Sequence, residues 1–545
     1  MAKELRTGRV IVTSRSAIVA FLSLSLIPSA RLLAQEVNAD SSQDKFAITE
    51  YRVLGNSVLA ATDIETVVYP HLGEGKTIAD VEVVRQALEK LYKDKGFGTV
   101  YVDIPEQTVN EGIVRLKVTE GRLDRVRITG ARYFANGAIR SELTALQAGT
   151  VLSLPELQTQ LGEVNQQSRD RAITPVLKAG RSPGTVDIEL KVQDSLPFHG
   201  SVEVNDRYSA NTTHTRASVN LSYDNLWQKF HSLSLQYQTS PEDMDETRVL
   251  AATYLAPLSN GNLLAVYAVD TNSDFAVVNT GGDLSVLGTG NIYGLRYIAR
   301  LPILGGYSQN ITLGTDFKDF QDDIVLDDGT TDTTPIRYMS WTAGYSGVLG
   351  RDRSTTGFNL NANFGMRGVV NDQAEFGYKR ADANASFFYL RGDASHLQSL
   401  WAGSAVYLKA VVQWTPDPLI SNEQFASGGA DGVRGYVESA LMGDRGVGGT
   451  FELRSPSMHA WFGDAVRQLA AFIFYDAAHV TQLAQVDDDG NLVTRGYNLY
   501  SAGAGLRFVG LGGMEAALDW AYPLRDWEDV EKGDSRIHFR VRYAF

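Results

Sequence analysis

Along the last ten residues two kinds of side chain alternate, with Ala544 as the exception. One face carries Ile537, Phe539, Val541, Tyr543 and Phe545, and the other carries Arg536, His538, Arg540 and Arg542. Such a strand cannot bury both faces in a soluble core, because the polar and mostly cationic face would lose its water. It can separate lipid from a wet lumen, and strands that cross lipid must close into a barrel to pair every backbone group. The C-terminus therefore predicts a transmembrane β-barrel.

The same alternation recurs from residue 198 onward in segments of about ten residues, and we count about 16 of them, an even number as in bacterial barrels. The connections expected to be short are residues 224–230, 257–262, 301–306 and 349–354. The connections expected to be long are residues 271–288, 321–335, 416–446 and 478–498. Short and long connections on opposite sides are typical of such a barrel. A soluble β-sandwich or propeller is the alternative, and the strongly polar face of so many strands argues against it.

The N-terminus has the pattern of a secretory signal peptide, which we assign to residues 1–34. Four basic residues (Lys3, Arg6, Arg9 and Arg15) precede a short apolar run at residues 17–27, and small residues follow. Cleavage is expected after Ala30 or Ala34, and an uncleaved anchor is the alternative. Residues 35–45 form a short polar segment.

Two α/β modules are expected between the signal and the barrel, at residues 46–121 and 122–194. In the first, residues 46–54 read as a strand, Thr62 and Glu65 have capping-box spacing, and apolar residues at helical steps predict a helix that ends near residue 96. Strands follow at residues 99–104 and 113–119. The second module repeats this order, with capping-box spacing at Ser153 and Glu156 and strands at residues 172–178 and 185–192. Two generic α/β domains without a shared task are the alternative.

The longest connection, residues 416–446, carries a glycine-rich segment that ends in Val433, Arg434, Gly435 and Tyr436. A connection of this length usually has a function or is disordered. On a later strand, parity places Phe474 and Asp476 on the inner face, opposite Ile473 and Tyr475. An ion pair between Arg434 and Asp476 inside the lumen would be charge-assisted and could be bidentate. An ordinary surface loop and an unrelated lumen carboxylate are the alternative.

Together these motifs resemble a known family. They are Glu120-Gly121-Arg122, Gly130 with Arg132-Tyr133-Phe134, Val433-Arg434-Gly435-Tyr436, Phe474-x-Asp476 and the terminal Phe545. Over nearly the whole mature chain, the sequence resembles the outer-membrane transporters of two-partner secretion, the haemolysin/haemagglutinin secretion and activation proteins. These belong to a superfamily of assembly and translocation barrels with POTRA domains.

The resemblance implies a Gram-negative outer-membrane protein with two periplasmic POTRA domains and a barrel of about 16 strands. The POTRA domains would capture a secreted client protein by β-augmentation, and the barrel would conduct it. The sixth outer loop would fold into the barrel, where Val433, Arg434, Gly435 and Tyr436 meet the wall at Phe474 and Asp476. Phe545 would be the signal that the barrel assembly machinery recognises. Many relatives carry an N-terminal plug helix, for which residues 35–45 are too short.

Rival functions remain open at this stage: a barrel-assembly insertase, a diffusion porin with a periplasmic appendage, and an outer-membrane lipase. The client could be an adhesin, a haemolysin or a haem-binding protein. The chain has no cysteine, and it shows no G-x-S-x-G, P-loop or H-E-x-x-H motif. We therefore expect no catalytic residue, no metal site and no cofactor. The net charge of −14 argues against a nucleic-acid partner. The partners that the resemblance implies are outer-membrane lipid, the secreted client and, during biogenesis, the barrel assembly machinery.

Two short motifs resemble binding sites, but we do not interpret either of them as one. Arg391-Gly392-Asp393 would fall at a periplasmic turn, where its likeness to an adhesion ligand is attributed to chance. Asp487-Asp488-Asp489-Gly490 lacks the spaced ligands and distal Glu of a calcium loop, so we interpret it as a solvated acidic turn.

Overall fold

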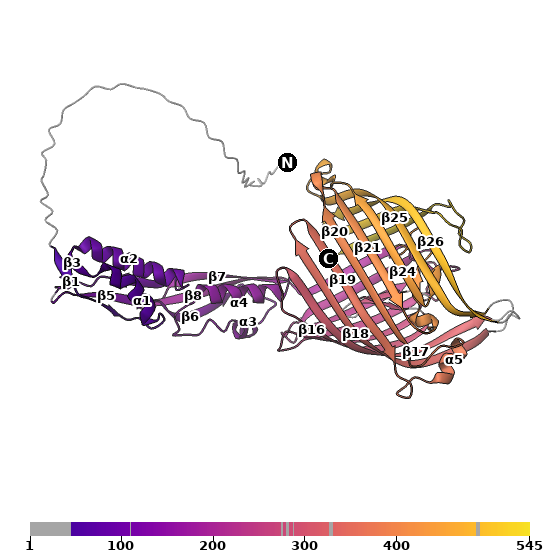
Figure 1. Cartoon of the computed structure of the whole chain (residues 1–545), viewed down its shortest axis with the longest axis horizontal. Coiled ribbons are helices and arrows are strands. Elements are labelled where there is room, and N and C mark those ends of the chain that lie inside the picture. Colours follow the sequence, from indigo (N-terminus) through magenta and orange to yellow (C-terminus); the bar gives the residue numbers. More distant parts are fainter. Residues whose placement is uncertain are drawn as a thin grey trace, which may run out of the picture. The chain divides into compact units, whose positions relative to one another are not determined.

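The computed structural model describes residues 45–109, 111–273, 276–279, 283–286, 288–325, 331–486 and 491–545 (Figure 1). The expected signal peptide, nearly all of the polar segment after it and the acidic turn at residues 487–490 lie outside the described residues. Among the helices of the described residues, none has the length and apolar character needed to cross a membrane.

The first module contains two helices with strands on either side of them. Its elements are β1 (Phe46–Ile48), β2 (Glu50–Leu54), α1 (Ala61–Val68), η1 (Tyr69–His71), β3 (Gly73–Lys76), α2 (Ile78–Asp94), β4 (Val100–Asp103) and β5 (Ile113–Glu120). The sheet order is β2-β5-β4, with β2 parallel to β5, and β1 pairs with β3. The inner faces of α2 and β5 are buried, which confirms both periodicities.

Two details of the first module differ from the sequence prediction. Residues 46–54 form two strands, because β1 pairs with β3 while β2 pairs with β5. The capping box at Thr62 and Glu65 is wrong: the N-cap is Ala60, and no side chain caps the helix. The helix starts one residue before Thr62, so the hydroxyl of Thr62 is already inside the first turn.

The second module repeats this pattern over β6 (Arg122–Thr129), α3 (Asn136–Glu142), α4 (Leu154–Gln166), β7 (Arg171–Ala179) and β8 (Thr185–Asp194). Its sheet order is β6-β8-β7, with β6 parallel and β7 antiparallel to β8. Leu157, Leu161 and Val164 of α4 share a buried cluster with residues of β7 and β8. Ser153 is the N-cap of α4 but makes no side-chain cap hydrogen bond, so the second capping box is also wrong. The sequence did not place α3.

Sixteen strands of the described residues close into an antiparallel barrel, which confirms the predicted fold and strand number. They are β9 (Phe198–Asn205), β10 (Arg216–Leu226), β11 (His231–Thr239), β12 (Arg248–Pro257), β13 (Leu263–Asn272), β16 (Gly290–Arg300), β17 (Tyr307–Val325), β18 (Thr331–Arg351), β19 (Ser354–Gly365), β20 (Phe388–Ser399), β21 (Ala405–Trp414), β24 (Arg445–Arg454), β25 (Val466–Val486), β26 (Leu492–Gly510), β27 (Met514–Pro523) and β28 (Arg536–Ala544). Figure 1 shows several of these strands side by side in one slanted wall. Strands β14 (Ala276–Asn279) and β15 (Asp283–Val286) pair separately in the connection between β13 and β16.

Two of the expected long connections are mostly strand. Strands β17 and β18 stay paired to Val325 and Thr331, and β25 and β26 stay paired to Val486 and Leu492. The predicted connections 321–335 and 478–498 are therefore wrong in extent. Backbone pairing needs no apolar side chains, so a hairpin can continue after the alternation that marks the lipid face has ended.

Two further local differences concern β20 and the connection before it. The motif Arg391-Gly392-Asp393 lies within β20, where Asp393 is opposite Asn359 of β19, so its placement at a turn is wrong. The connection before β20 contains the helix α5 (Gln373–Lys379), and Phe376 of this helix belongs to a buried cluster that also includes Leu419 and Ile420. The connection between β21 and β24 therefore packs on α5 and the neighbouring strands.

Candidate functional site: the loop tip and the barrel wall

The connection between β21 and β24 folds back on itself. Within it, η3 (Ser421–Glu423) is followed by β22 (Phe425–Ser427), which pairs with β23 (Leu441–Gly443). Between these two strands the chain turns at Gly428, Gly429 and Gly435, all of which have positive φ angles. The connection therefore has secondary structure of its own, because a short antiparallel pair closes the base of the tip. We call residues 428–440 the loop tip.

Arg434 of the loop tip contacts Asp476 of β25 in a bidentate ion pair. Its Nε and Nη2 donate to the two carboxylate oxygens of Asp476 at 2.8 and 2.9 Å. The backbone N–H of Arg434 also donates to Asp476, at 3.2 Å. Arg434 is 3% exposed and Asp476 is fully buried. The hypothesised ion pair between Arg434 and Asp476 is therefore present in the fold.

The charge of Arg434 is shared with further carboxylates of the wall. Its Nη1 donates to Glu452 of β24 at 2.9 Å and lies 3.8 Å from Asp519 of β27. Arg454 and Arg507 pair with Glu452 and Asp519, respectively. The cluster thus holds three guanidinium groups and three carboxylates, and this balance is what a buried ion cluster requires.

Aromatic rings and glycines shape the wall beneath Arg434. The guanidinium carbon lies 3.5 Å from the ring centre of Phe474, which favours a cation–π interaction. On β26, a Cβ at Gly503 would come within 2.5 Å of the Phe474 ring. A Cβ at Gly505 would come within 2.4 Å of the ring of Phe472. These glycines leave the space in which the two rings lie against the wall.

Gly435 binds the last barrel strand through its backbone. Its N–H donates to Nε2 of His538 at 3.0 Å, and Nδ1 of His538 lies 2.9 Å from Asp206. Because Nε2 accepts, Nδ1 carries the proton and donates to Asp206. Gly435 has φ 95°, and a Cβ there would lie 3.2 Å from the backbone nitrogen of Pro523. Only glycine fits this position without strain.

Val433 and Tyr436 are buried in a hydrophobic cluster with Phe425, Leu441 and Val480. The hydroxyl of Tyr436 donates to the backbone oxygen of Arg525 at 2.7 Å, and the backbone oxygen of Tyr500 lies 3.2 Å from the same hydroxyl. The four residues predicted for the tip therefore all contact the wall or the strand connections.

A second carboxylate of the tip, Glu438, is buried without a bidentate partner. Its backbone N–H donates to the backbone oxygen of Tyr208, and its carboxylate accepts from the backbone N–H of Ala430 at 3.1 Å. Burial is the main cause that raises the pKa of Glu438 to about 7; the nearby Arg207 lowers this pKa and Asp431 raises it, and both effects are included in that value. Arg207 forms an ion pair with Asp431. The tip therefore carries a group that titrates near neutral pH.

Two buried carboxylates anchor the base of the loop. Glu423 accepts hydrogen bonds from Lys318, Tyr338 and Tyr389 at 2.5 to 2.7 Å. Asp444 forms a bidentate ion pair with Arg380, which follows α5, at 2.6 and 2.8 Å. These contacts fix both ends of the loop independently of Arg434.

Phe545 lies at the seam where β28 meets β9. Its backbone exchanges hydrogen bonds with Gly200 at 2.9 and 3.0 Å, and its side chain is 56% exposed. A Cβ at Gly200 would lie 2.4 Å from the Phe545 ring, so the ring lies over this glycine.

Glu452, Asp519, His538, Gly503 and Gly505 were not predicted as site residues. For Asp519 and His538 the sequence did indicate the inner face of the barrel, because both stand at polar positions of alternating segments. The resemblance placed the loop tip at Phe474 and Asp476, but nothing in the sequence showed that the tip also reaches Asp519 of β27 and His538 of β28. The glycines acquire meaning only once the ring positions are known.

Comparison with known proteins identifies the family. The family profile described as haemolysin secretion/activation protein ShlB/FhaC/HecB matches residues 184–508, and that of the ShlB-type POTRA domain matches residues 46–121. The chain belongs to the haemolysin secretion/activation protein family. Members of this family are two-partner secretion transporters. This transporter is accordingly an outer-membrane protein that translocates a partner protein and has its POTRA region in the periplasm.

Relatives agree over almost the full length of the chain. The outer membrane transporter CdiB of Escherichia coli is 23% identical over 555 residues, covering 97% of this chain and 87% of the relative. The heme/hemopexin transporter protein HuxB of Haemophilus influenzae is 22% identical over 496 residues, covering 88% and 84%. The solved structure of CdiB from Escherichia coli gives a TM-score of 0.57 at 20% identity and covers 94% of this chain and 93% of that one. At this identity the structural likeness shows the fold.

Proposed function

We propose that the loop tip is the gate of this translocator and that Arg434 holds the gate closed against Asp476. The observation that carries the proposal is the buried, bidentate contact between a loop cation and a wall carboxylate. Breaking one partner of such a pair leaves an uncompensated buried charge, so the closed position is strongly preferred at rest. Other residues of the tip stabilise the same position. Val433 and Tyr436 pack in an apolar cluster, the N–H of Gly435 donates to His538, and the hydroxyl of Tyr436 donates to the backbone oxygen of Arg525.

The route of the client would follow the polar wall beside the tip. A cavity of about 870 Å³ is lined by residues of β9 to β12, among them Ser218, Asn220 and Ser234. Hydroxyl and amide side chains can exchange hydrogen bonds with a passing backbone without holding it, which suits conduction of an extended chain. Movement of the tip away from Asp476 would widen this route.

Capture of the client would take place at the sheet edges of the periplasmic modules. The order β6-β8-β7 places β6 and β7 at the edges of the second module, and β7 carries the 42% exposed Leu177. In the first module, Tyr101 of the edge strand β4 is 68% exposed. An extended client segment could pair with such an edge by β-augmentation, with these side chains providing apolar contacts.

The same proposal covers the domains, the driving force and the assembly of the protein. Residues 1–34 are a signal peptide, residues 46–121 and 122–194 are POTRA modules, and residues 195–545 are the barrel. The protein is a passive conductor and not an enzyme, and client folding outside the cell drives export. The barrel assembly machinery recognises Phe545 during insertion into lipid.

A stalled client tests the route directly. The chain has no cysteine, so single cysteines report on single positions. Asn220 lines the cavity, whereas the adjacent Val219 is 39% exposed and lies on the outer face of the same strand. We therefore compare Asn220→Cys with Val219→Cys. With a secreted partner protein stalled by a folded C-terminal fusion, cross-linking is expected from position 220 and not from position 219. Equal or absent cross-linking at both positions would contradict a route through the barrel.

A further inference from the structure

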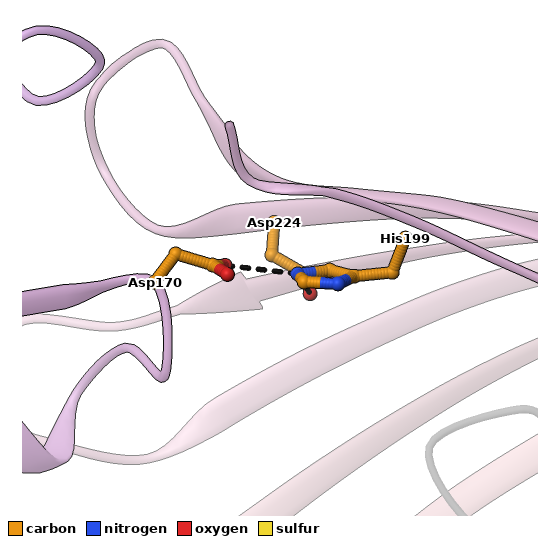
Figure 2. Close-up of side chains that lie close together, drawn as sticks. All are labelled: Asp170, His199 and Asp224. Carbon is orange, nitrogen blue, oxygen red and sulfur yellow. Dashed lines mark hydrogen bonds and ion pairs between the residues drawn. The ribbon is translucent and has the colours of Figure 1, made fainter. Parts of the chain in front are cut away.

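A cluster of three metal-binding side chains lies where the second module meets the barrel. Asp170 lies between α4 and β7, His199 is on β9, and Asp224 is on β10 (Figure 2). One ligand atom from each residue lies within 4.8 Å of the others. From the donor set and this geometry, we propose that the three residues form a binding site for a divalent transition metal, with Zn²⁺ as the best match.

The distances suit a small tetrahedral ion. Nε2 of His199 lies 2.9 Å from a carboxylate oxygen of Asp170 and 3.6 Å from one of Asp224. In a tetrahedral zinc site with bonds near 2 Å, ligand atoms are roughly 3.3 Å apart. The two distances lie on either side of this value, so small side-chain shifts would let the ion enter. An imidazole nitrogen favours Zn²⁺ over Ca²⁺, which prefers six to eight oxygen ligands.

The backbone and nearby hydroxyl groups hold the ligands in place. In the register of β9 and β10, His199 is opposite Ser222, so Asp224 is its diagonal neighbour on the same face. The N–H of Asp224 donates to Pro197 at 2.8 Å. Asp170 has a 5% exposed side chain, and the hydroxyl of Ser195 lies 3.3 Å from its second carboxylate oxygen. Such outer contacts orient a ligand carboxylate before the metal arrives.

The charge of the cluster also matches a divalent ion. Two carboxylates and a neutral imidazole sum to −2. Arg169 lies 3.2 Å from Asp224, but its side chain is 66% exposed and can turn outward when the ion binds. Zn²⁺ would neutralise the cluster completely, with water in the fourth position.

Binding would join the second module to the barrel. Asp170 belongs to the module, whereas His199 and Asp224 belong to barrel strands. The same two parts already touch where Arg171 stacks over Phe134 of the module and Phe230 of the barrel, at 5.3 and 4.8 Å. A metal ion at the cluster would add a second, coordinate link and stiffen this joint.

The test uses the full-length protein in detergent, stripped with chelator and titrated with Zn²⁺ by calorimetry and with Co²⁺ by visible absorption. One equivalent should bind, and Co²⁺ should give the intense bands of a tetrahedral site. Asp170→Asn, His199→Gln and Asp224→Asn should each weaken binding by at least about tenfold. His231→Gln is the matched control, because His231 lies on β11 and contacts Tyr254.

Heat-modifiable gel mobility verifies that each variant forms its barrel. If the wild type binds no stoichiometric Zn²⁺, or if the three variants bind as well as the wild type, the proposal is overturned. A cluster that titrates with pH and ignores both metals would be a proton-bridged ion pair, which also overturns it. None of these readouts depends on secretion, so they are separate from the test of the proposed function.

Discussion

Arg434 and Asp476 are 42 residues apart in the chain, yet their side chains form two parallel hydrogen bonds of 2.8 and 2.9 Å in the interior of the barrel. One residue belongs to a loop and the other to a strand of the wall. If the loop moved away from the wall, the buried cluster of charges would therefore lose one of its cations.

Arg434→Ala should release the loop tip. The change leaves Asp476 without its bidentate partner and Glu452 with one cation fewer, at a cost of roughly 3–5 kcal/mol to the closed position. Conductance of the purified protein in planar bilayers should rise. Arg434→Lys should give an intermediate value, because an ammonium group cannot form the planar two-point contact. Wild-type conductance for the alanine variant would show that other contacts hold the tip.

Exchanging the two charges should not restore closure. In the double variant Arg434→Asp, Asp476→Arg, the new loop carboxylate would face Glu452 and Asp519 as well as the new arginine. Like charges in a buried cluster repel, so we expect conductance at least as high as in Arg434→Ala. Recovery of the wild-type conductance would mean that the pair acts alone.

Gly435→Ala should weaken closure through the backbone. The residue has φ 95°, and a Cβ would crowd the nitrogen of Pro523 at 3.2 Å. We expect a loss of about 1–2 kcal/mol in the closed position, seen as more frequent openings in single-channel records. Gly377→Ala is the control, because its Cβ would meet no atom within 4 Å and its φ is not positive. The same opening frequency in both variants would contradict strain at Gly435.

Closure should depend on pH through Glu438. Its pKa is about 7 in the closed tip and near 4.5 once the residue reaches water, so the closed form takes up a proton that the open form does not hold. Lowering the pH from 8 to 5 should therefore favour closure, and the effect should level off below about 4.5. Glu438→Gln should remove this part of the dependence, as measured by open probability across the pH range. An unchanged pH profile in that variant would place the titration elsewhere.

Gly503→Ala should disturb the wall beneath the arginine. A Cβ would overlap the Phe474 ring and the backbone oxygen of Trp520, at 2.5 and 2.1 Å, so the ring must move and its contact with Arg434 is lost. We expect a barrel with a lower unfolding temperature in heat-modifiability gels and a higher conductance. Gly357→Ala on β19 is the control, since its Cβ would make only an ordinary contact at 3.4 Å. Equal behaviour of the two variants would contradict the role of Gly503.

The alternation of side chains along a strand predicted which residues of the site face the inside of the barrel. The outer positions of Ile473 and Tyr475 and the inner positions of Phe474 and Asp476 follow from the period of two, and burial agrees with each. The barrel and its strand number were predictable for the same reason. Parity also put His538 on the inner face, without showing its contact with Gly435.

Non-local contacts set the limit of prediction. The cluster around Arg434 depends on the neighbourhood of β24, β25 and β27 and on a loop that folds inward, and neither is encoded by any local pattern. The long hairpins were missed because backbone pairing continues at Val325 and Val486 after the apolar alternation ends. The capping boxes failed for two reasons: α1 begins one residue before Thr62, whereas α4 begins directly after Ser153 but the Ser153 side chain makes no cap hydrogen bond.

The most direct test of the gate is export of a secreted partner protein of this transporter, measured together with bilayer conductance for Arg434→Ala and Asp476→Ala. Arg495→Ala is the control, since this arginine is exposed on β26. We expect export to fall at least about tenfold in both variants, the equivalent of losing more than 1.4 kcal/mol, while conductance rises and the barrels insert normally. Wild-type export from both variants would contradict it.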